Sequence, residues 1–332
     1  TEPLEASEVA RIAKSVARYE PAPDDADPPT RDLGHAQVLA MLFENQLRWC
    51  SDWGRWLQWT GTHWGEVTNE EVAHRAAEAL RRHYAQQIAA TSDKNRMAEL
   101  TRAVLEACTY SRIQGALGFL RGWPGVITRA SELDNDPWLL NVANGTLDLR
   151  TGDLRPHNPG DLCTKVCGVA YDPTASTGAW ERHISMVLPN PNIRREVQRS
   201  LGLALVGEHL EERLDLWFGT GQNGKSVTIT ALLNILGDYA VRAAPDLLVQ
   251  SKFDRHPTEV ADLQGRRLVF SVEVDQGKRL AEALVKDLTG GDRLKARYMR
   301  QDFFEFKPTH SLFLAVNHKP TITGQDLGIW RR

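Results

Sequence analysis

The chain has 332 residues, a quarter of them charged, and a formal net charge of -3 at pH 7. This length favours two domains, each large enough to bury a core of its own. The nearly balanced charge excludes a protein covered in positive charge, so any nucleic-acid contact must be a local basic patch. The four cysteines show no paired framework, and no signal peptide or membrane-spanning stretch is recognisable. We therefore expect a cytoplasmic protein that makes no membrane contact.

The first part of the chain divides into a linker and a helical region. Residues 1–34 contain the acidic, proline-rich run Pro21–Pro29, which cannot continue a helix and predicts a flexible segment. Residues 35–190 are predicted to form a mainly helical N-terminal domain with small β-hairpins. Within it, apolar spacing predicts helices over about 35–47, 69–90 and 93–115.

Five of the ten tryptophans lie between residues 49 and 64. The alternation around Thr60 and Gly61 predicts a β-hairpin at this place. Such side chains are able to stack on unpaired bases, but we favour a second interpretation, the core of a small sheet packed on helices. The tryptophans are Trp49, Trp53, Trp56, Trp59 and Trp64.

Two short patterns between residues 134 and 167 resemble metal sites. Cys163 and Cys167 have the spacing of a ligand pair but no second pair nearby, so we interpret them as free thiols. Asp134 and Asp136 resemble paired carboxylates, but no third ligand is evident, and we interpret them as part of a turn. Between these patterns, residues 139–152 predict short strands joined by Asn-Gly and Thr-Gly turns.

The strongest motif reads Gly-x4-Gly-Lys-Ser, the phosphate-binding P-loop. The apolar run 214–218 before it suits a strand, and helical spacing follows it until Gly237. Strand, glycine loop and helix are the context that this motif requires, because the helix N-terminus helps to hold the anion. The loop predicts a site for ATP and Mg²⁺, formed by Gly219, Thr220, Gly221, Gln222, Asn223, Gly224, Lys225 and Ser226. In it, Lys225 would contact the outer phosphates, and Ser226 would bind Mg²⁺.

Polar residues follow two later apolar runs that suit buried parallel strands. Residues 268–272 end at Glu273, with Asp275 two positions on, and residues 311–316 end at Asn317. Because open α/β sheets bind ligands at the carboxyl ends of their strands, we expect all three near the phosphates. We assign Glu273 as the Mg²⁺-linked acid and water activator and Asp275 as its helper. Asn317 would touch the γ-phosphate or orient the attacking water. Residues 191–332, with a helix near 193–206, thus predict an α/β ATPase domain with a mostly parallel central sheet.

A basic hairpin is predicted between these two strands. In an extended strand Arg293, Lys295 and Arg297 share one face, and residues 303–306 suit a returning strand. One interpretation is a solvated edge hairpin whose cations prevent aggregation. Within an ATPase domain we favour contact with a DNA backbone, to which Arg300 and Lys307 would add charge.

Two arginines, Arg331 and Arg332, close the chain. One of them is predicted to reach the γ-phosphate of a neighbouring subunit as an arginine finger.

The order of these motifs resembles the phage and plasmid primase-helicase family, whose motor is a superfamily 3 helicase of the AAA+ type. Residues 138–154 also resemble the region that precedes the motor in poxvirus-type primase-helicases. The stretches that carry the likeness are Gly219–Ser226, Gly265–Glu273, Leu288–Asp292, Phe306–Pro308, Ala315–Pro320 and Gly328–Arg332.

The resemblance implies a hexameric ring that moves along single-stranded or forked DNA. It makes Lys225 and Ser226 the Walker A pair, Glu273 part of Walker B and Asn317 the sensor residue, with Arg331 or Arg332 as the finger. Two features depart from the family. The acids are separated in Glu-Val-Asp, and no primase-polymerase signature is present. A primase domain or protein would then be a further partner.

Three functions are therefore compared. We favour an ATP-dependent DNA helicase of phage or mobile-element replication in a bacterial cytoplasm. The alternative is a nucleotide-gated DNA-binding or origin-loading module without unwinding activity. A small-molecule P-loop kinase is disfavoured, because no acceptor-binding lid is recognisable and the basic hairpin would be unexplained.

Overall fold

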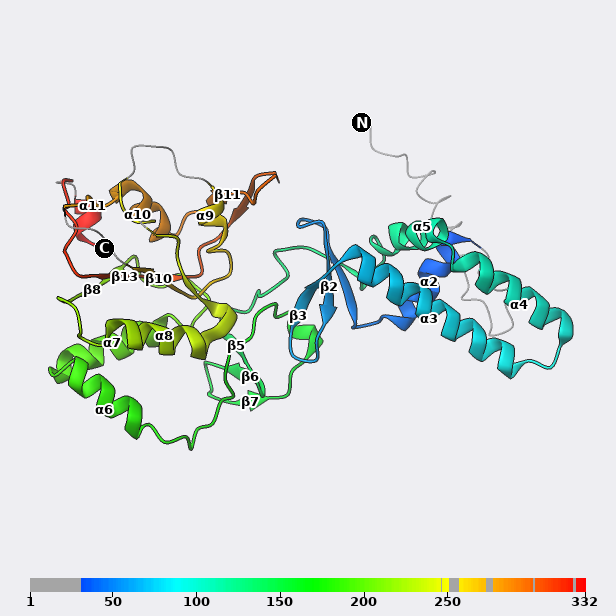
Figure 1. Ribbon diagram of the computed structural model, residues 1–332, viewed down its shortest axis with the longest axis horizontal. Helices are drawn as coiled ribbons and strands as arrows, with labels where there is room; N and C mark the ends of the chain where they lie inside the picture. The colour runs from blue at the N-terminus through cyan, green and yellow to red at the C-terminus, as the bar shows by residue number, and fades with distance from the viewer. Residues whose placement is uncertain (1–30, 246, 251–256, 273–276, 301, 325–326) are drawn as a thin grey trace, which may run out of the picture. The chain divides into compact units, whose positions relative to one another are not determined.

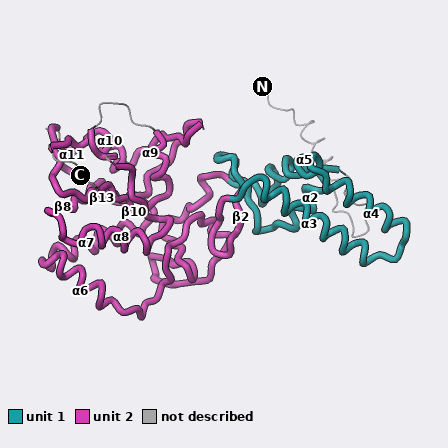
Figure 2. Tube along the Cα trace, viewed as in Figure 1, with its two compact units in different colours: residues 1–56, 67–128 teal, residues 57–66, 129–332 magenta. Residues whose placement is uncertain are grey.

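The computed structural model describes residues 31–245, 247–250, 257–272, 277–300, 302–324 and 327–332 (Figure 1). The chain divides into two compact units, one formed by residues 1–56 and 67–128 and the other by residues 57–66 and 129–332 (Figure 2). The segment predicted as the N-terminal domain, 35–190, is shared between them. The prediction of a domain boundary at residue 190 stays a prediction.

The first unit is built from helices that enclose an apolar core. Its elements are α2 (Asp32–Leu42), β1 (Leu47–Cys50), α3 (Asn69–Ala90), α4 (Lys94–Ala107), α5 (Tyr110–Leu120) and β4 (Ile127–Thr128). Leu39, Leu80 and Leu117 are buried at its centre, and β1 pairs in parallel with β4. Helix α3 begins at a capping box in which Thr68 and Glu71 exchange side-chain to backbone hydrogen bonds. The tryptophan Trp56 is buried in the same core, as the core interpretation predicted.

Two predicted helices of this unit differ from the structure. The helix expected over 35–47 is α2, which ends at Leu42 and is followed by a turn in which Asn45 takes a left-handed conformation (φ 55°) before β1. The helix expected over 93–115 is broken into α4 and α5. At the break, Thr109 is extended and its hydroxyl donates to the Glu106 carbonyl, satisfying an acceptor at the end of α4. Helix α2 also includes residues 32–34, which the sequence assigned to the linker.

The hairpin predicted around Thr60 is present as β2 (Arg55–Trp59) and β3 (Trp64–Val67). The boundary between the units passes through both strands in the sequence. Thr60 donates its backbone N–H to His63, which closes the turn. Trp64 is buried, and its indole N–H donates to the Pro159 carbonyl.

The second unit begins with an antiparallel sheet, β5 (Leu139–Val142), β6 (Gly145–Asp148) and β7 (Leu154–Arg155). This is the predicted group of short strands. Asn141 is fully buried there, and its amide donates to the carbonyls of Thr62 and Lys165. Asp134 and Asp136 have protein partners, as expected of a turn. Asp134 accepts from the Thr164 N–H (2.7 Å), and Asp136 pairs with Arg150.

The rest of the second unit is a parallel sheet covered on both faces. Its strands, in spatial order, are β8 (Leu214–Phe218), β13 (Ser311–Val316), β10 (Leu268–Val272) and β9 (Ala240–Arg242). All their ladders are parallel. Figure 1 shows α7 (Pro191–Leu203) and α8 (Lys225–Leu236) on one face. On the other face lie α9 (Thr258–Ala261), α10 (Glu282–Leu288) and α11 (Leu327–Trp330). The α/β class and the parallel sheet are therefore confirmed.

Successive side chains of the central strands point alternately into the two cores, one on each face of this sheet. Phe270 and Phe313 pack with Ile229 and Leu232 of α8 on one face. Val269 packs on the other face with side chains of α10. Helix α6 (Gly178–Val187) precedes α7, and the hairpin β11 (Leu294–Ala296) and β12 (Phe304–Phe306) is antiparallel, as predicted.

Arg267 connects the sheet to its surroundings. It is 4% exposed, and its guanidinium donates to the carbonyls of Leu205 and Leu139 and lies over the Tyr239 ring. A charge at such a position is tolerated only because these carbonyls replace water. This side chain therefore ties the start of β10 to the antiparallel sheet and to the end of α7.

Candidate nucleotide site

The predicted P-loop connects β8 to α8, as its motif requires. Gly224 precedes the helix in a left-handed conformation (φ 78°), which favours glycine. Added to this residue, a Cβ would lie 2.4 Å from Val187 Cγ2, so a side chain there would also clash with α6. The loop therefore needs glycine at this position for two independent reasons.

Lys225 begins α8, and its ammonium group is held by oxygens of the loop and of Asn317, which follows β13. Its Nζ donates to the Gly219 carbonyl (2.5 Å), to Asn223 Oδ1 (3.2 Å) and to Asn317 Oδ1 (3.1 Å). Partial burial lowers the pKa of this lysine from its usual value. These oxygens hold the cation where phosphate oxygens would be expected to replace them.

Strand order brings Asn317 to the loop. Strand β13 lies between β8 and β10, and its last residue, Val316, pairs with Phe218, the residue before the loop. The sequence separates Lys225 and Asn317 by 92 residues, yet the sheet places their side chains in hydrogen-bond contact. Asn317 therefore follows a strand and contacts Lys225, whereas its contact with a phosphate stays a prediction.

The remaining loop residues line the same turn. Ser226 is exposed at the first turn of α8, and Gln222 is left-handed (φ 47°) beside Gly221. Thr220 is part of the same loop between the strand and the helix. Glu273 and Asp275, predicted as the acids of the site, lie outside the described residues. The assignment of Mg²⁺ to Ser226 and Glu273 therefore stays a prediction.

The two terminal arginines lie in different settings. Arg332 pairs with Glu212 (3.1 Å), and its carbonyl accepts from the N–H of Leu214, the first residue of β8. The P-loop follows the other end of that strand, about 13 Å away at the usual rise per residue. Arg331 is exposed. The structure thus does not bring either arginine to the P-loop of its own chain.

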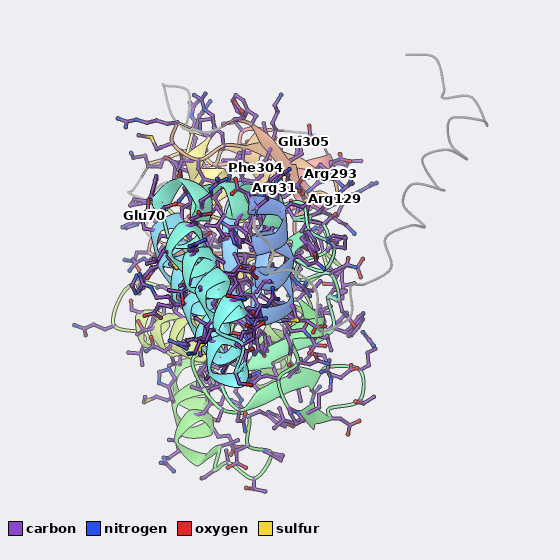
Figure 3. All side chains as sticks on the ribbon, turned by 90° about the vertical axis from the view of Figure 1, so that its right-hand side faces the viewer. Arg31, Glu70, Arg129, Arg293, Phe304 and Glu305 are labelled. Atoms are coloured by element: carbon purple, nitrogen blue, oxygen red, sulfur yellow. The ribbon has the colours of Figure 1, made fainter. Side chains whose placement is uncertain are left out.

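The basic hairpin has one buried and one exposed face, as the alternation predicted. Leu294, Ala296 and Phe306 are buried, whereas Lys295 is exposed and faces Glu305 across the ladder. Figure 3 labels Arg293, Phe304 and Glu305 on this hairpin.

Aromatic contacts fix the cations of the hairpin. Lys295 Nζ lies 5.2 Å from the centre of the exposed Phe303 ring, and Arg297 Cζ lies 4.8 Å from it. Arg300 is exposed with a positive φ of 59°, whereas Lys307 pairs with Glu208. Of the predicted DNA-binding residues, Lys295 and Arg297 therefore both lie over the Phe303 ring, whereas Lys307 forms an ion pair with Glu208.

Sequence reasoning missed two residues that lie beside the loop or its neighbouring strand. His183 of α6 lies 2.9 Å from Thr228 Oγ1 on the first turn of α8. Lys319, which follows Asn317 by two positions, places Nζ 5.0 Å from the centre of the Phe218 ring. Nothing in the pattern of α6 indicated its contact with the loop. The position of Lys319 after the predicted strand was the available signal for the second residue.

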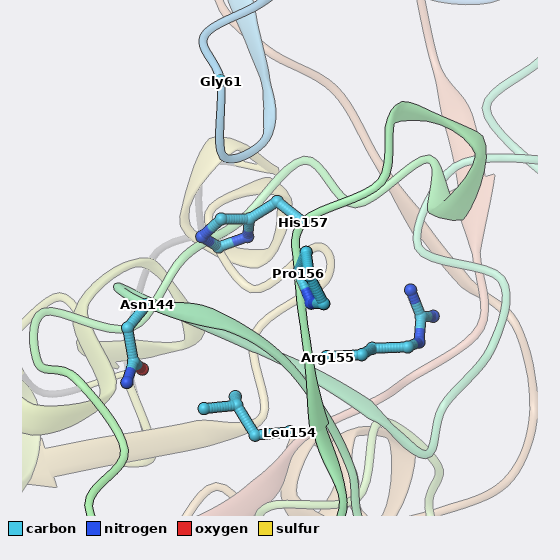
Figure 4. A pocket seen from close by; sticks show the side chains of 6 residues that line it. All are labelled: Gly61, Asn144, Leu154, Arg155, Pro156 and His157. Carbon is cyan, nitrogen blue, oxygen red and sulfur yellow. The ribbon is translucent and has the colours of Figure 1, made fainter.

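A hollow of about 480 Å³ lies on the antiparallel sheet (Figure 4). Its lining side chains include Arg155, which pairs with Asp161, and His157, whose Nδ1 lies 2.8 Å from Asn141 Oδ1. Its polar groups are thus engaged with the protein.

Cys163 and Cys167 are buried free thiols, and burial raises the pKa of each to about 12. The described residues contain no cluster of three or more metal-ligating side chains. Nor does any described helix have the length and apolarity to cross a bilayer.

Two family profiles match most of the chain between them. The profile described as "D5 N terminal like" matches residues 36–189. The profile described as "Family of unknown function (DUF5906)" matches residues 217–332 and includes the whole P-loop. The sequence therefore has a recognised N-terminal part and a C-terminal part whose family description states no function.

The curated relatives are proteins of large DNA viruses. "Putative helicase L207/L206" of Acanthamoeba polyphaga mimivirus is 30% identical over 206 residues, 60% of this chain. "Putative primase C962R" of African swine fever virus is 26% identical over 212 residues, again 60% of this chain. The chain spans only 22% of the length of each. The similarity is to helicase-named and primase-named proteins.

A solved structure also aligns with the fold. The A form apo structure of the NrS-1 C-terminal region has a TM-score of 0.49 and 11% sequence identity. The alignment covers 90% of this chain and 59% of that chain.

Proposed function

We propose that this chain is the ATP-dependent motor of a DNA helicase that acts in replication. The observation that carries the proposal is the contact between Lys225 Nζ and Asn317 Oδ1 at 3.1 Å. It joins the lysine of a phosphate-binding loop to a polar residue at the carboxyl end of the neighbouring strand. Nucleoside triphosphate hydrolysis needs such a pair, a cation for the phosphates and a polar group near the terminal one.

ATP and Mg²⁺ are the proposed ligands of the loop. Lys225 would exchange its three protein oxygens for phosphate oxygens, which carry full negative charge and therefore bind the ammonium more strongly. Asn317, released from the lysine, would then be free to orient a water or contact the γ-phosphate. Ser226 would bind the ion together with Glu273, which lies outside the described residues.

DNA is the proposed substrate of the motor. The cations Lys295 and Arg297, held around Phe303, are suited to a phosphate backbone and an adjacent base. The helicase and primase names of the viral relatives support a role on DNA. We further propose a hexameric ring of the AAA+ type, in which Arg331 of one subunit contacts the nucleotide of the next. The ion pair of Arg332 with Glu212 favours Arg331 over Arg332 for that role.

The test is hydrolysis of ATP by the purified chain with and without single-stranded DNA. We expect DNA to stimulate hydrolysis and Lys225→Ala to abolish it, since the loop then lacks its cation. Lys94→Ala, on α4 in the other unit, is the matched control and should hydrolyse ATP at the wild-type rate. A rate that Lys225→Ala leaves unchanged would refute the site. A rate that DNA leaves unchanged would refute the translocase.

The rival is a nucleotide-gated DNA-binding module, in which ATP only orders an oligomer. A strand-displacement assay on a forked DNA duplex distinguishes the two functions, because only a motor unwinds the duplex and releases one of its strands. Glu273→Gln gives a second criterion. In a motor it should slow turnover and spare ATP binding, whereas a binding module would show no turnover to slow.

A further inference from the structure

The end of helix α6 packs against the glycine that precedes helix α8. A Cβ added to Gly224 would clash with Val187, so Val187 occupies the space beside this glycine. One turn earlier on α6, His183 Nε2 lies 2.9 Å from Oγ1 of Thr228, the fourth residue of α8. Both helices belong to the second unit, and α6 lies on the side of α8 away from the sheet (Figure 1). Helix α6 therefore contacts both the loop and the helix that follows it.

The hydrogen bonds at Thr228 have a definite direction. The Thr228 hydroxyl donates to the Gly224 carbonyl at 3.0 Å, and the Thr228 backbone N–H donates to the same oxygen at 3.0 Å. A hydroxyl group has a single hydrogen, which the carbonyl uses, so toward His183 the hydroxyl can only accept. His183 therefore donates its Nε2–H to Thr228, and the series of bonds runs from α6 through the hydroxyl to the Gly224 carbonyl.

The planar peptide group connects this carbonyl to the phosphate site. In a trans peptide the carbonyl and the following N–H point in opposite directions. Because the Gly224 oxygen points into α8, the N–H of Lys225 points out of the N-terminus of that helix. The first N–H groups of a helix have no acceptor within it, and a P-loop uses them to bind phosphate. The orientation of the Gly224 carbonyl therefore controls how the loop presents its N–H groups.

We propose that His183 is a positioning residue of the nucleotide site. Its hydrogen bond to Thr228 holds α6 beside the loop, where Val187 restricts the movement of Gly224, and the Gly224 carbonyl stays directed into α8. The loop is then ordered for phosphate before a ligand binds, which strengthens binding. This inference rests on the proposed function. It adds to the site a residue that lies outside the profile containing the P-loop, which begins at residue 217.

The test measures binding of ATP and of inorganic tripolyphosphate, which lacks the sugar and the base. Each is titrated with Mg²⁺ into the whole chain by calorimetry. His183→Leu removes the donor, and we expect it to weaken both ligands by the equivalent of one hydrogen bond, about 2- to 12-fold. His183→Gln should keep both affinities within about twofold of the wild type, because its amide nitrogen reaches the position of Nε2. His183→Asn, whose shorter amide matches only the position of Nδ1, should not.

A second variant tests the contact with the hydroxyl. Thr228→Val removes the acceptor of His183. Since both changes break the same hydrogen bond, adding His183→Leu to Thr228→Val should weaken the two ligands no further. The control is Met186→Ala, which removes an apolar side chain that is 74% exposed on the same helix. It should leave the binding of both ligands unaffected.

Urea unfolding of the same variants distinguishes positioning from stability. A histidine with only a structural role would change the free energy of unfolding and leave the affinity of the folded chain for both ligands unchanged, which would overturn the proposal. Weaker binding of ATP alone would overturn it too, since the phosphates would then be held normally. So would additive losses in the double variant, or equal affinities of His183→Gln and His183→Asn. A wild-type chain that binds neither ligand would instead refute the nucleotide site itself.

Discussion

His310 makes the stability of the second unit depend on pH. The residue lies between β12 and β13 and is 1% exposed. Burial and, to a smaller extent, the neighbouring His209 lower the pKa of its imidazole from 6.5 to about 4, although a backbone contact at Leu288 partly opposes them. The folded chain thus keeps this side chain neutral at pH values at which the unfolded chain protonates it.

The sign and size of the effect follow from that difference. Below pH 6.5 the unfolded state binds the additional proton, so stability falls as the pH falls, until the folded pKa of about 4 is reached. Each pH unit in this window contributes about 1.4 kcal/mol to the free energy of unfolding. The full loss between pH 6.5 and 4 is therefore about 3 kcal/mol. Above pH 6.5 the contribution is complete and constant.

The assay is urea unfolding of the wild type and of His310→Leu at several pH values between 7.5 and 4.5, roughly the window of the titration. Leucine cannot be protonated, so the difference in unfolding free energy between the two proteins isolates the histidine. We expect this difference to shift in favour of the variant by about 1.4 kcal/mol per pH unit on acidification. His74→Gln, at a 77% exposed side chain, is the control and should show almost no shift. A difference for His310→Leu that stays constant from neutral to acidic pH would refute the reasoning.

Three further predictions concern the sheet and the two candidate sites. Asn317→Ala should slow ATP hydrolysis about 100-fold while ATP affinity changes less than about threefold, measured by steady-state kinetics and calorimetry; equal losses in both would contradict its role. Arg267→Met should lower the free energy of unfolding by about 3 kcal/mol, since buried carbonyls lose their donor, whereas the exposed Arg195→Met should change it by less than about 0.5 kcal/mol. The double variant Lys295→Gln and Arg297→Gln should reduce the salt dependence of single-stranded DNA binding by about 1.4 in logarithmic slope, and an unchanged slope would exclude the hairpin from the interface.

The strands of the parallel sheet and the P-loop were predictable because their signals are local. Runs such as 268–272 and 311–316 are apolar throughout, as strands covered on both faces must be. The alternation around Lys295 also gave its exposed face correctly. In these segments the sequence pattern and the tertiary environment require the same residues.

The remaining features depend on contacts between distant segments. Two adjacent arginines, Arg266 and Arg267, would be expected on the surface. Arg267 is buried because the carbonyls of Leu139 in the antiparallel sheet and of Leu205 after α7 accept its hydrogen bonds. The contact of α6 with Gly224 requires the chain to bring α6 back beside α8. The spacing of apolar residues in the sequence does not predict this arrangement. Likewise, the break between α4 and α5 at Thr109 follows from a hydroxyl that bonds a carbonyl, and helical periodicity alone continues through it.

The position of β13 between β8 and β10 has a consequence for how the protein is made. In the described sheet β8 pairs only with β13, which emerges from the ribosome almost a hundred residues later. Until then the P-loop strand has no ladder to join, and Lys225 has no Asn317 to meet. The loop proposed to bind the nucleotide is thus synthesised early, and its neighbouring strand is added late. A nascent chain that stops before residue 311 should leave β8 open to proteases and unable to retain ATP, and the site should appear in a single step once β13 inserts.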